Sequence, residues 1–197
     1  HYFGPSMLMS YLGALKSWLY APIMALFGPT VWAVRTPVLL AATLTIHLTG
    51  WFLRRISGWT AALIAVSLLA TDATFQVTAV FDWGPVVLQN LLHIVGLILI
   101  VKWYREKKPA LLFLAGFTFG LGLWNKALFL WNLSGMAVAL IVVALPTIIR
   151  LWRVKCLIVF LIGICIGAAP LIVFNIKFPG ITIQENAHSS LADVPHK

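Results

Sequence analysis

The residues best suited to chemistry occur in short polar motifs between long apolar runs, and Asp82 lies in one of them. It belongs to the sequence Phe81-Asp82-Trp83-Gly84-Pro85, in which Gly and Pro favour a tight turn. A carboxylate held there can act as a base, bind a metal or accept a hydrogen bond from a substrate hydroxyl, with Trp83 beside it in a substrate cavity. The Asp-x-x-Pro spacing also suits a helix N-terminus, so capping of the next helix is the alternative role.

Lys126 is the second candidate, and it follows Trp124 and Asn125 between two strongly apolar runs. An ammonium at membrane depth costs about 2.5–3.5 kcal/mol, so a cation held there needs an anionic partner. Asp82, Asp72 or a lipid phosphate could be that partner. The alternative is a lysine that extends to the membrane surface and needs none. Trp124 and Asn125 are candidates to line the same cavity.

Lys16 and Arg35 are two further cations next to apolar segments. If they lie at the same end of a helix bundle as Lys126, the three cations would form a pocket for a phosphate group. The sequence therefore predicts a binding site for a phosphate-bearing ligand at that end.

Histidines and cysteines give weaker signals. His47 and His93 lie within apolar runs, where a neutral imidazole could ligate haem iron or chlorophyll magnesium, or simply form a hydrogen bond within the bundle. Cys156 and Cys165 share one apolar run, and their spacing on a helix is too long for a disulfide. The sequence contains no Gly-rich nucleotide loop and no zinc-ligand spacing.

The elements that must position these residues are membrane helices. The chain is 61% hydrophobic and only 10% charged, whereas a soluble domain carries about 25% charged residues. We therefore predict an all-α, polytopic transmembrane bundle of about five to seven helices. The net charge of +9 does not indicate nucleic-acid binding, because the basic residues are dispersed between apolar runs.

Hydropathy predicts where these helices lie. Residues 1–175 form the expected transmembrane domain, residues 176–197 an extracytoplasmic tail or loop, and residues 7–27 an interfacial or partly inserted segment. The predicted spans are 37–52, 60–80, 86–103, 110–124, 128–149 and 156–174.

Basic residues alternate between the predicted connections, which gives the bundle a direction. Nine of the fourteen Lys and Arg residues fall on one side, and the positive-inside rule makes that side cytoplasmic. Asp82, Lys16 and Lys126 then belong to the opposite side. The nine are Arg54, Arg55, Lys102, Arg105, Lys107, Lys108, Arg150, Arg153 and Lys155.

Several short motifs together resemble one enzyme family. They are Gly13-Ala14-Leu15-Lys16-Ser17-Trp18, Leu26-Phe27-Gly28-Pro29, Trp32-Ala33-Val34-Arg35-Thr36-Pro37, Thr71-Asp72, Phe81-Asp82-Trp83-Gly84-Pro85 and Leu123-Trp124-Asn125-Lys126. Their order and spacing over residues 5–150 resemble bacterial members of the dolichyl-phosphate-mannose–protein mannosyltransferase-like group. These are GT-C membrane glycosyltransferases related to the aminoarabinose transferase that modifies lipid A.

The resemblance implies inverting transfer of a sugar from a polyprenyl-phosphate donor to an extracytoplasmic acceptor, on the periplasmic side of the bacterial inner membrane. Lys126 matches the lysine that faces the donor phosphate, with Lys16 and Arg35 as further phosphate contacts. Asp82 matches an acidic position that contacts the substrate or a divalent metal, the only cofactor that the resemblance suggests.

One departure from the family is that its main catalytic carboxylate follows a first membrane helix, and nothing in this sequence matches that region. We expect the chain to be an internal fragment, with the main base upstream of His1. The alternative function is a non-catalytic structural subunit of a larger membrane complex, to which a pigment or haem could bind through His47 or His93.

Overall fold

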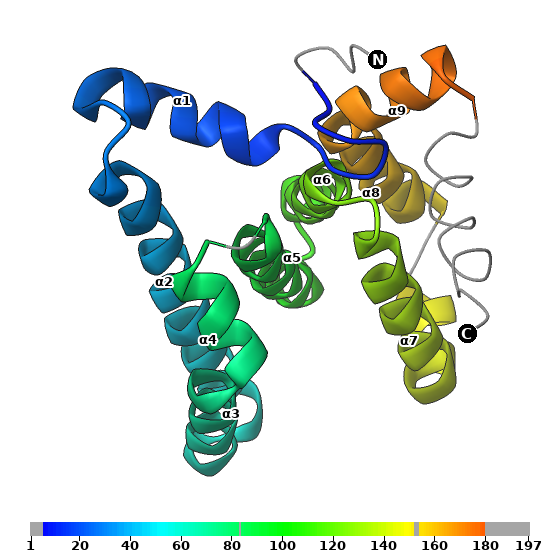
Figure 1. The fold of residues 1–197 in the computed structure, drawn as a ribbon. Helices are drawn as coiled ribbons and strands as arrows, with labels where there is room; N and C mark the ends of the chain where they lie inside the picture. The colour runs from blue at the N-terminus through cyan, green and yellow to red at the C-terminus, as the bar shows by residue number, and fades with distance from the viewer. Residues whose placement is uncertain (1–5, 83, 152–153, 180–197) are drawn as a thin grey trace, which may run out of the picture.

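The computed structural model describes residues 6–82, 84–151 and 154–179, and within these ranges every regular element is a helix. The predicted all-α fold class is therefore confirmed (Figure 1). The helices are α1 Leu15–Phe27, α2 Val31–Ser57, α3 Trp59–Thr71, α4 Ala73–Val80, α5 Val86–Glu106, α6 Pro109–Asn125, α7 Phe129–Leu151, α8 Val154–Gly167 and α9 Ala169–Lys177.

The structure confirms fewer membrane-crossing helices than the predicted five to seven among the residues that it describes. Among the residues described with their side chains, which include α7 only over Phe129–Val143, α2 and α5 are long and apolar enough, and the number rises to four if the pairs α3–α4 and α8–α9 each count as one bent span. The bends are 58° and 69°, respectively. Helices of this composition suit a lipid environment, and the count of five to seven spans is not confirmed.

The two bends have local causes. Asp72 is extended and its carboxylate accepts a hydrogen bond from the Phe75 amide (2.6 Å), so it caps α4 and interrupts the predicted span 60–80. Pro170 stands in the first turn of α9, where it has no backbone N–H to continue the hydrogen bonding of α8 and its ring would clash with the carbonyl four residues earlier, and the predicted span 156–174 breaks at Ala168.

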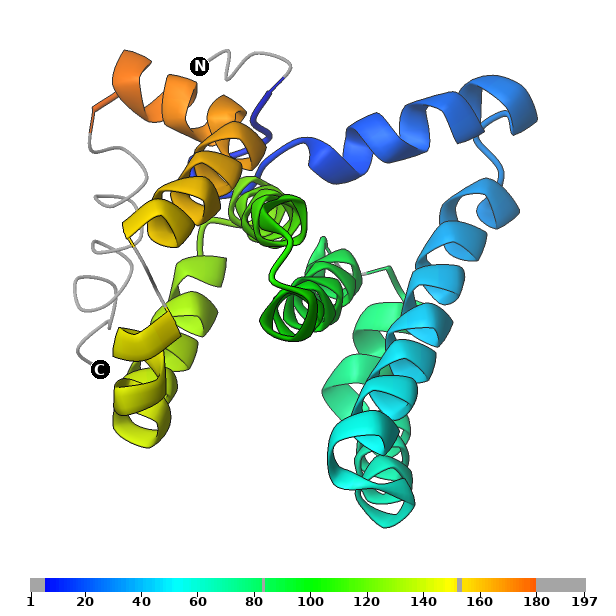
Figure 2. The same cartoon turned by 180° about the vertical axis from the view of Figure 1, so that it is seen from behind.

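Helix α6 lies between α5 and α8, and glycines bring its backbone against α8 (Figures 1 and 2). A Cβ atom added to Gly120 would lie 2.3 Å from the Ile164 carbonyl oxygen, and one added to Gly167 would lie 2.3 Å from the Phe117 carbonyl oxygen. Gly116 and Gly163 make equally close approaches. Each helix thus carries a Gly-x-x-x-Gly motif, the pattern that permits close helix packing in membranes.

Helix α1 lies across the end of the bundle, from the end of α6 to the start of α2 (Figures 1 and 2). It belongs to the predicted interfacial segment 7–27 and is too short to be counted as a candidate span. Its position matters for function, because it carries Lys16 over the turn that joins α4 to α5.

The segment before α1 is fixed to the C-terminal end of α6. The Ala127 amide donates to the Tyr11 carbonyl (2.9 Å), and Leu12 and Lys126 form an isolated antiparallel bridge. A Cβ atom added to Gly13 would lie 1.7 Å from the Trp124 carbonyl oxygen, so only glycine fits there. This contact sets where α1 begins and therefore where Lys16 lies.

Candidate functional site

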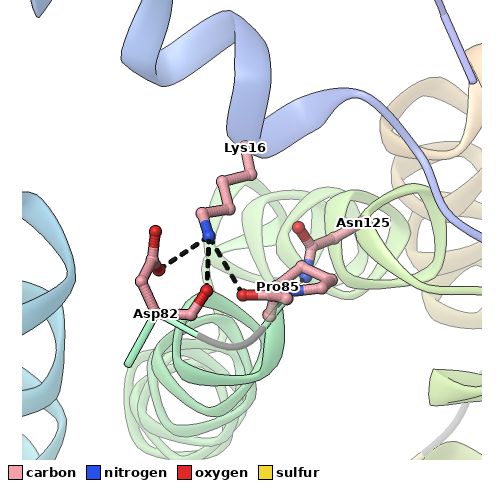
Figure 3. Close-up of polar contacts among 5 residues, drawn as sticks. Lys16, Asp82, Pro85 and Asn125 are labelled. Atoms are coloured by element: carbon pink, nitrogen blue, oxygen red, sulfur yellow. Dashed lines mark hydrogen bonds and ion pairs between the residues drawn. The ribbon is translucent and has the colours of Figure 1, made fainter. Parts of the chain in front are cut away.

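Lys16 and Asp82 form an ion pair between the first turn of α1 and the turn that joins α4 to α5 (Figure 3). Lys16 Nζ donates to Asp82 Oδ1 over 2.6 Å, and also to the backbone carbonyls of Gly84 (3.1 Å) and Asp82 (3.4 Å). An ammonium has three N–H donors, so this turn engages all of them. The sequence predicted both residues for the site, and the structure brings them together.

The backbone of the turn is shaped to present this carboxylate. Asp82 has φ = 53° and Gly84 has φ = 68°, both in the left-handed region that favours glycine. Asp and Asn tolerate this region better than most other residues. Pro85 then occupies the N-cap position of α5 with no side chain capping it, so the alternative role of Asp82 as the cap of this helix is wrong.

The pair is mostly removed from solvent. The Asp82 side chain is 9% exposed and the Lys16 side chain 21%. The other ion pair among the described residues, Lys108 with Glu106, is about as short at 2.8 Å, but its side chains are 70% and 38% exposed. Low exposure strengthens the attraction and also makes each charge costly to leave unpaired.

A hydrogen bond from Asn125 connects the C-terminal end of α6 to the same turn. Its side chain is fully buried, and its Nδ2 donates to the Pro85 carbonyl oxygen over 2.9 Å (Figure 3). Its Oδ1 has no hydrogen-bond partner among the described residues. Asn125 therefore lies behind the turn and supports it, rather than lining an open substrate cavity as predicted.

Two cavities adjoin the Lys16–Asp82 pair. One of about 470 Å³ opens beside the segment before α1, and one of about 150 Å³ lies between α1, α2 and α5. Lys16, Asp82, Tyr20 and Gly84 line both, and most of the other lining side chains are apolar. The arrangement places one anion and one cation in an otherwise apolar recess.

Tyr20 is a site residue that the sequence analysis missed. Its ring centroid lies 5.3 Å from Lys16 Nζ, and burial together with the negative charge of Asp82 raises the pKa of its phenol to about 12. The signal was the i, i+4 spacing of Lys16 and Tyr20, which puts them on one face of a helix.

The other predicted site residues are not all brought to the pair. The Trp124 ring packs edge-on against Trp18, at 6.3 Å between centroids. Lys126 is half-buried beside Leu12, lines neither cavity and forms no ion pair within the described part of the chain. Arg35 is exposed on α2 and also lines neither cavity. Trp83 lies outside the described residues, as does most of the predicted tail.

The histidines and cysteines that the structure describes do not gather into a metal site. His93 Nε2 lies 3.0 Å from Met136 Sδ, and its ring packs against Phe119 and Phe129. His47 is exposed on α2. Residues 6–82, 84–151 and 154–179 contain no group of three His, Cys, Asp or Glu side chains able to hold a metal ion. Cys156 and Cys165 are free thiols, as predicted.

Comparison with known proteins assigns no family. No family profile, curated protein or solved structure matches this chain.

Proposed function

We propose that this chain is the core of a membrane glycosyltransferase that transfers a sugar from a polyprenyl-phosphate donor to an acceptor hydroxyl with inversion. The observation that carries the proposal is the Lys16–Asp82 pair, which lines two largely apolar cavities at one end of the helices. An apolar recess suits a lipid-linked donor, and the charged pair is suited to its reacting group. The order of the motifs around Lys16, Asp82 and Lys126 supports the same reading.

In this proposal Asp82 acts on the acceptor. Its Oδ1 is engaged by Lys16, whereas its Oδ2 accepts no hydrogen bond from the described residues. A carboxylate so held can take the acceptor proton as the new bond to the anomeric carbon forms and the bond to the donor phosphate breaks.

Lys126 is the proposed contact for the donor phosphate. Its ammonium has no carboxylate partner among the described residues, and its backbone pairs with Leu12, four residues before Lys16. A free cation can stabilise the negative charge that develops on the leaving phosphate. Lys16 has its three donors engaged and is assigned as a positioning residue for Asp82, which revises its predicted role as a phosphate contact.

The orientation in the membrane belongs to the same proposal. Arg55, Lys102 and Arg105 lie at the C-terminal ends of α2 and α5, whereas the Lys16–Asp82 pair lies next to the N-terminus of α5. The positive-inside rule then gives a site on the periplasmic side of a bacterial inner membrane.

The proposal is tested with the full-length protein and undecaprenyl-phosphate mannose as the donor probe. Asp82→Asn should lower kcat at least about tenfold, in line with the loss of a general base or acceptor contact. Lys126→Ala should lower kcat as well as raise the donor KM, because the cation would contact the donor phosphate and stabilise the charge that develops on it. Lys177→Ala is the matched control, because Lys177 is an exposed lysine on α9 and should behave as wild type. Near-normal transfer by both site variants, at wild-type levels of folded protein, would refute the assignment.

A second candidate is a non-catalytic structural subunit of a larger membrane complex. The observation in its favour is that the Lys16 ammonium is fully engaged by its own turn, as a structural clamp would be. This candidate predicts no sugar transfer by the wild-type protein and co-purification with other membrane subunits. A visible absorption spectrum would detect a bound haem or pigment.

A further inference from the structure

The opposite end of the molecule carries a further cavity with a charged lining, which the proposed transfer reaction does not use. It has a volume of about 230 Å³ and lies between the C-terminal ends of α2 and α5. Its charged lining residues are Arg55, Lys102, Arg105 and Glu106. Three cations and one carboxylate give this cavity a net positive charge.

The single carboxylate does not neutralise those cations. Glu106 Oε2 lies 2.8 Å from Lys108 Nζ, a lysine outside the lining, so its charge is shared between that lysine and Lys102 in the cavity. Arg55, Lys102 and Arg105 form no ion pair with any described carboxylate. Arg55 stacks on the ring of Trp51, 4.7 Å from its centroid, which orients the guanidinium and leaves its N–H groups available to an anion.

The cavity lies where a lipid headgroup would be. Helix α5 has 21 residues and is therefore about 31 Å long, close to the roughly 30 Å thickness of a bilayer's hydrocarbon core. Its N-terminus follows the Lys16–Asp82 turn, so the basic cavity is about one membrane thickness away from that pair.

Aromatic side chains surround this basic end, as at a membrane surface. Arg54 lies over the Trp59 ring at 4.9 Å, and Lys107 lies over the Tyr104 ring at 4.3 Å. Below the charged groups, the cavity is lined by apolar side chains such as Ile98 and Val101. A charged rim above an apolar wall fits a phospholipid better than it fits a free ion.

We propose that the cavity between α2 and α5 binds the phosphate of an anionic phospholipid, through Arg55, Lys102 and Arg105. A lipid phosphate and free phosphate would be bound by the same charge-assisted hydrogen bonds, from guanidinium or ammonium to phosphate oxygen. The lipid adds acyl chains, which contact the apolar wall. A simpler role for the three cations is to stabilise the carbonyl ends of α2 and α5, and this role requires no ligand.

The test compares lipid binding by two charge-matched variants of the full-length protein in detergent. Lys102→Gln/Arg105→Gln removes two cations from the cavity. Lys155→Gln/Lys177→Gln removes two exposed cations elsewhere. Native mass spectrometry measures binding of phosphatidylglycerol, with phosphatidylcholine as the zwitterionic comparison and inorganic phosphate as competitor. Thermal unfolding of each variant checks that the fold is retained.

The first variant should bind phosphatidylglycerol about thirtyfold more weakly, or about 2 kcal/mol, because each of the two cations lost from the cavity lining contributes about 1 kcal/mol to holding the phosphate. The control variant should bind it as wild type does, and phosphatidylcholine should bind weakly to all three proteins. Equal loss in both variants, or equal binding of the two lipids, would overturn the proposal. Displacement of phosphatidylglycerol by inorganic phosphate at similar concentration would assign the cavity to a free anion and overturn the lipid assignment.

Discussion

Breaking the Lys16–Asp82 pair should destabilise the fold, and the two residues should be strongly coupled. At 2.6 Å and an effective dielectric constant near 20, the Coulomb attraction is about 6 kcal/mol. Desolvation of the two charges offsets several kcal/mol of this. Since Lys16 remains 21% exposed, we expect a net coupling energy of about 2 kcal/mol.

The single substitutions should differ in cost. Lys16→Met leaves a carboxylate that is only 9% exposed without its partner, and should lower the free energy of unfolding by about 3 kcal/mol. Asp82→Asn keeps the side-chain shape and the two carbonyl acceptors of the ammonium, and should cost about half as much. The double variant should cost less than the sum of the two.

The assay is unfolding by sodium dodecyl sulfate in mixed micelles, read as a double-mutant cycle. The Lys108–Glu106 pair is the control, because it is similarly short but exposed, and Lys108→Met with Glu106→Gln should show far weaker coupling. Additive effects at Lys16 and Asp82, within about 0.5 kcal/mol, would refute the view that this pair fixes α1 on the bundle.

Two further predictions concern the same end of the molecule. Gly13→Ala should destabilise the protein by at least about 3 kcal/mol, because the new methyl would lie 1.7 Å from the Trp124 carbonyl oxygen. The control Gly135→Ala, in open space on α7, should stabilise the protein slightly. Equal effects of the two substitutions in thermal unfolding would contradict this packing. Tyr20 should lose its proton near pH 12 in the folded protein and near pH 10 when unfolded. The folded state therefore holds more protons between these values, and the free energy of unfolding falls as pH rises through this range. Tyr20→Phe should remove this contribution to the fall, and an unchanged pH dependence of unfolding would count against the environment described for this phenol.

Part of the site could be predicted from the sequence because its residues differ in polarity from the residues around them. Lys16 and Asp82 are charged residues beside long apolar runs, and such charges need a partner wherever they are buried. The sequence did not show that they are partners of each other. They are 66 residues apart, and Lys126 was an equally reasonable partner for the same carboxylate. Among the described residues, Lys126 pairs with neither Asp82 nor Asp72.

Residues that cap or start helices interrupt two of the membrane spans that hydropathy predicted. Mostly apolar residues flank Asp72 and Ala168 on both sides, so hydropathy alone predicted single spans over 60–80 and 156–174. Asp72 caps a new helix and Pro170 lies in the first turn of another, and the chain bends at both places within an apolar run. The close packing of α6 on α8 could have been predicted, since both contain Gly-x-x-x-Gly.

The sequence by itself determined the helical class, the apolar character and the candidate residues, because these follow from composition and from periodicity along one segment. The tertiary structure decided which candidates meet. Gly13 brings the chain against α6 and sets the start of α1, and that start places Lys16 over the turn that holds Asp82. Such contacts depend on the packing of distant segments, which no local pattern encodes.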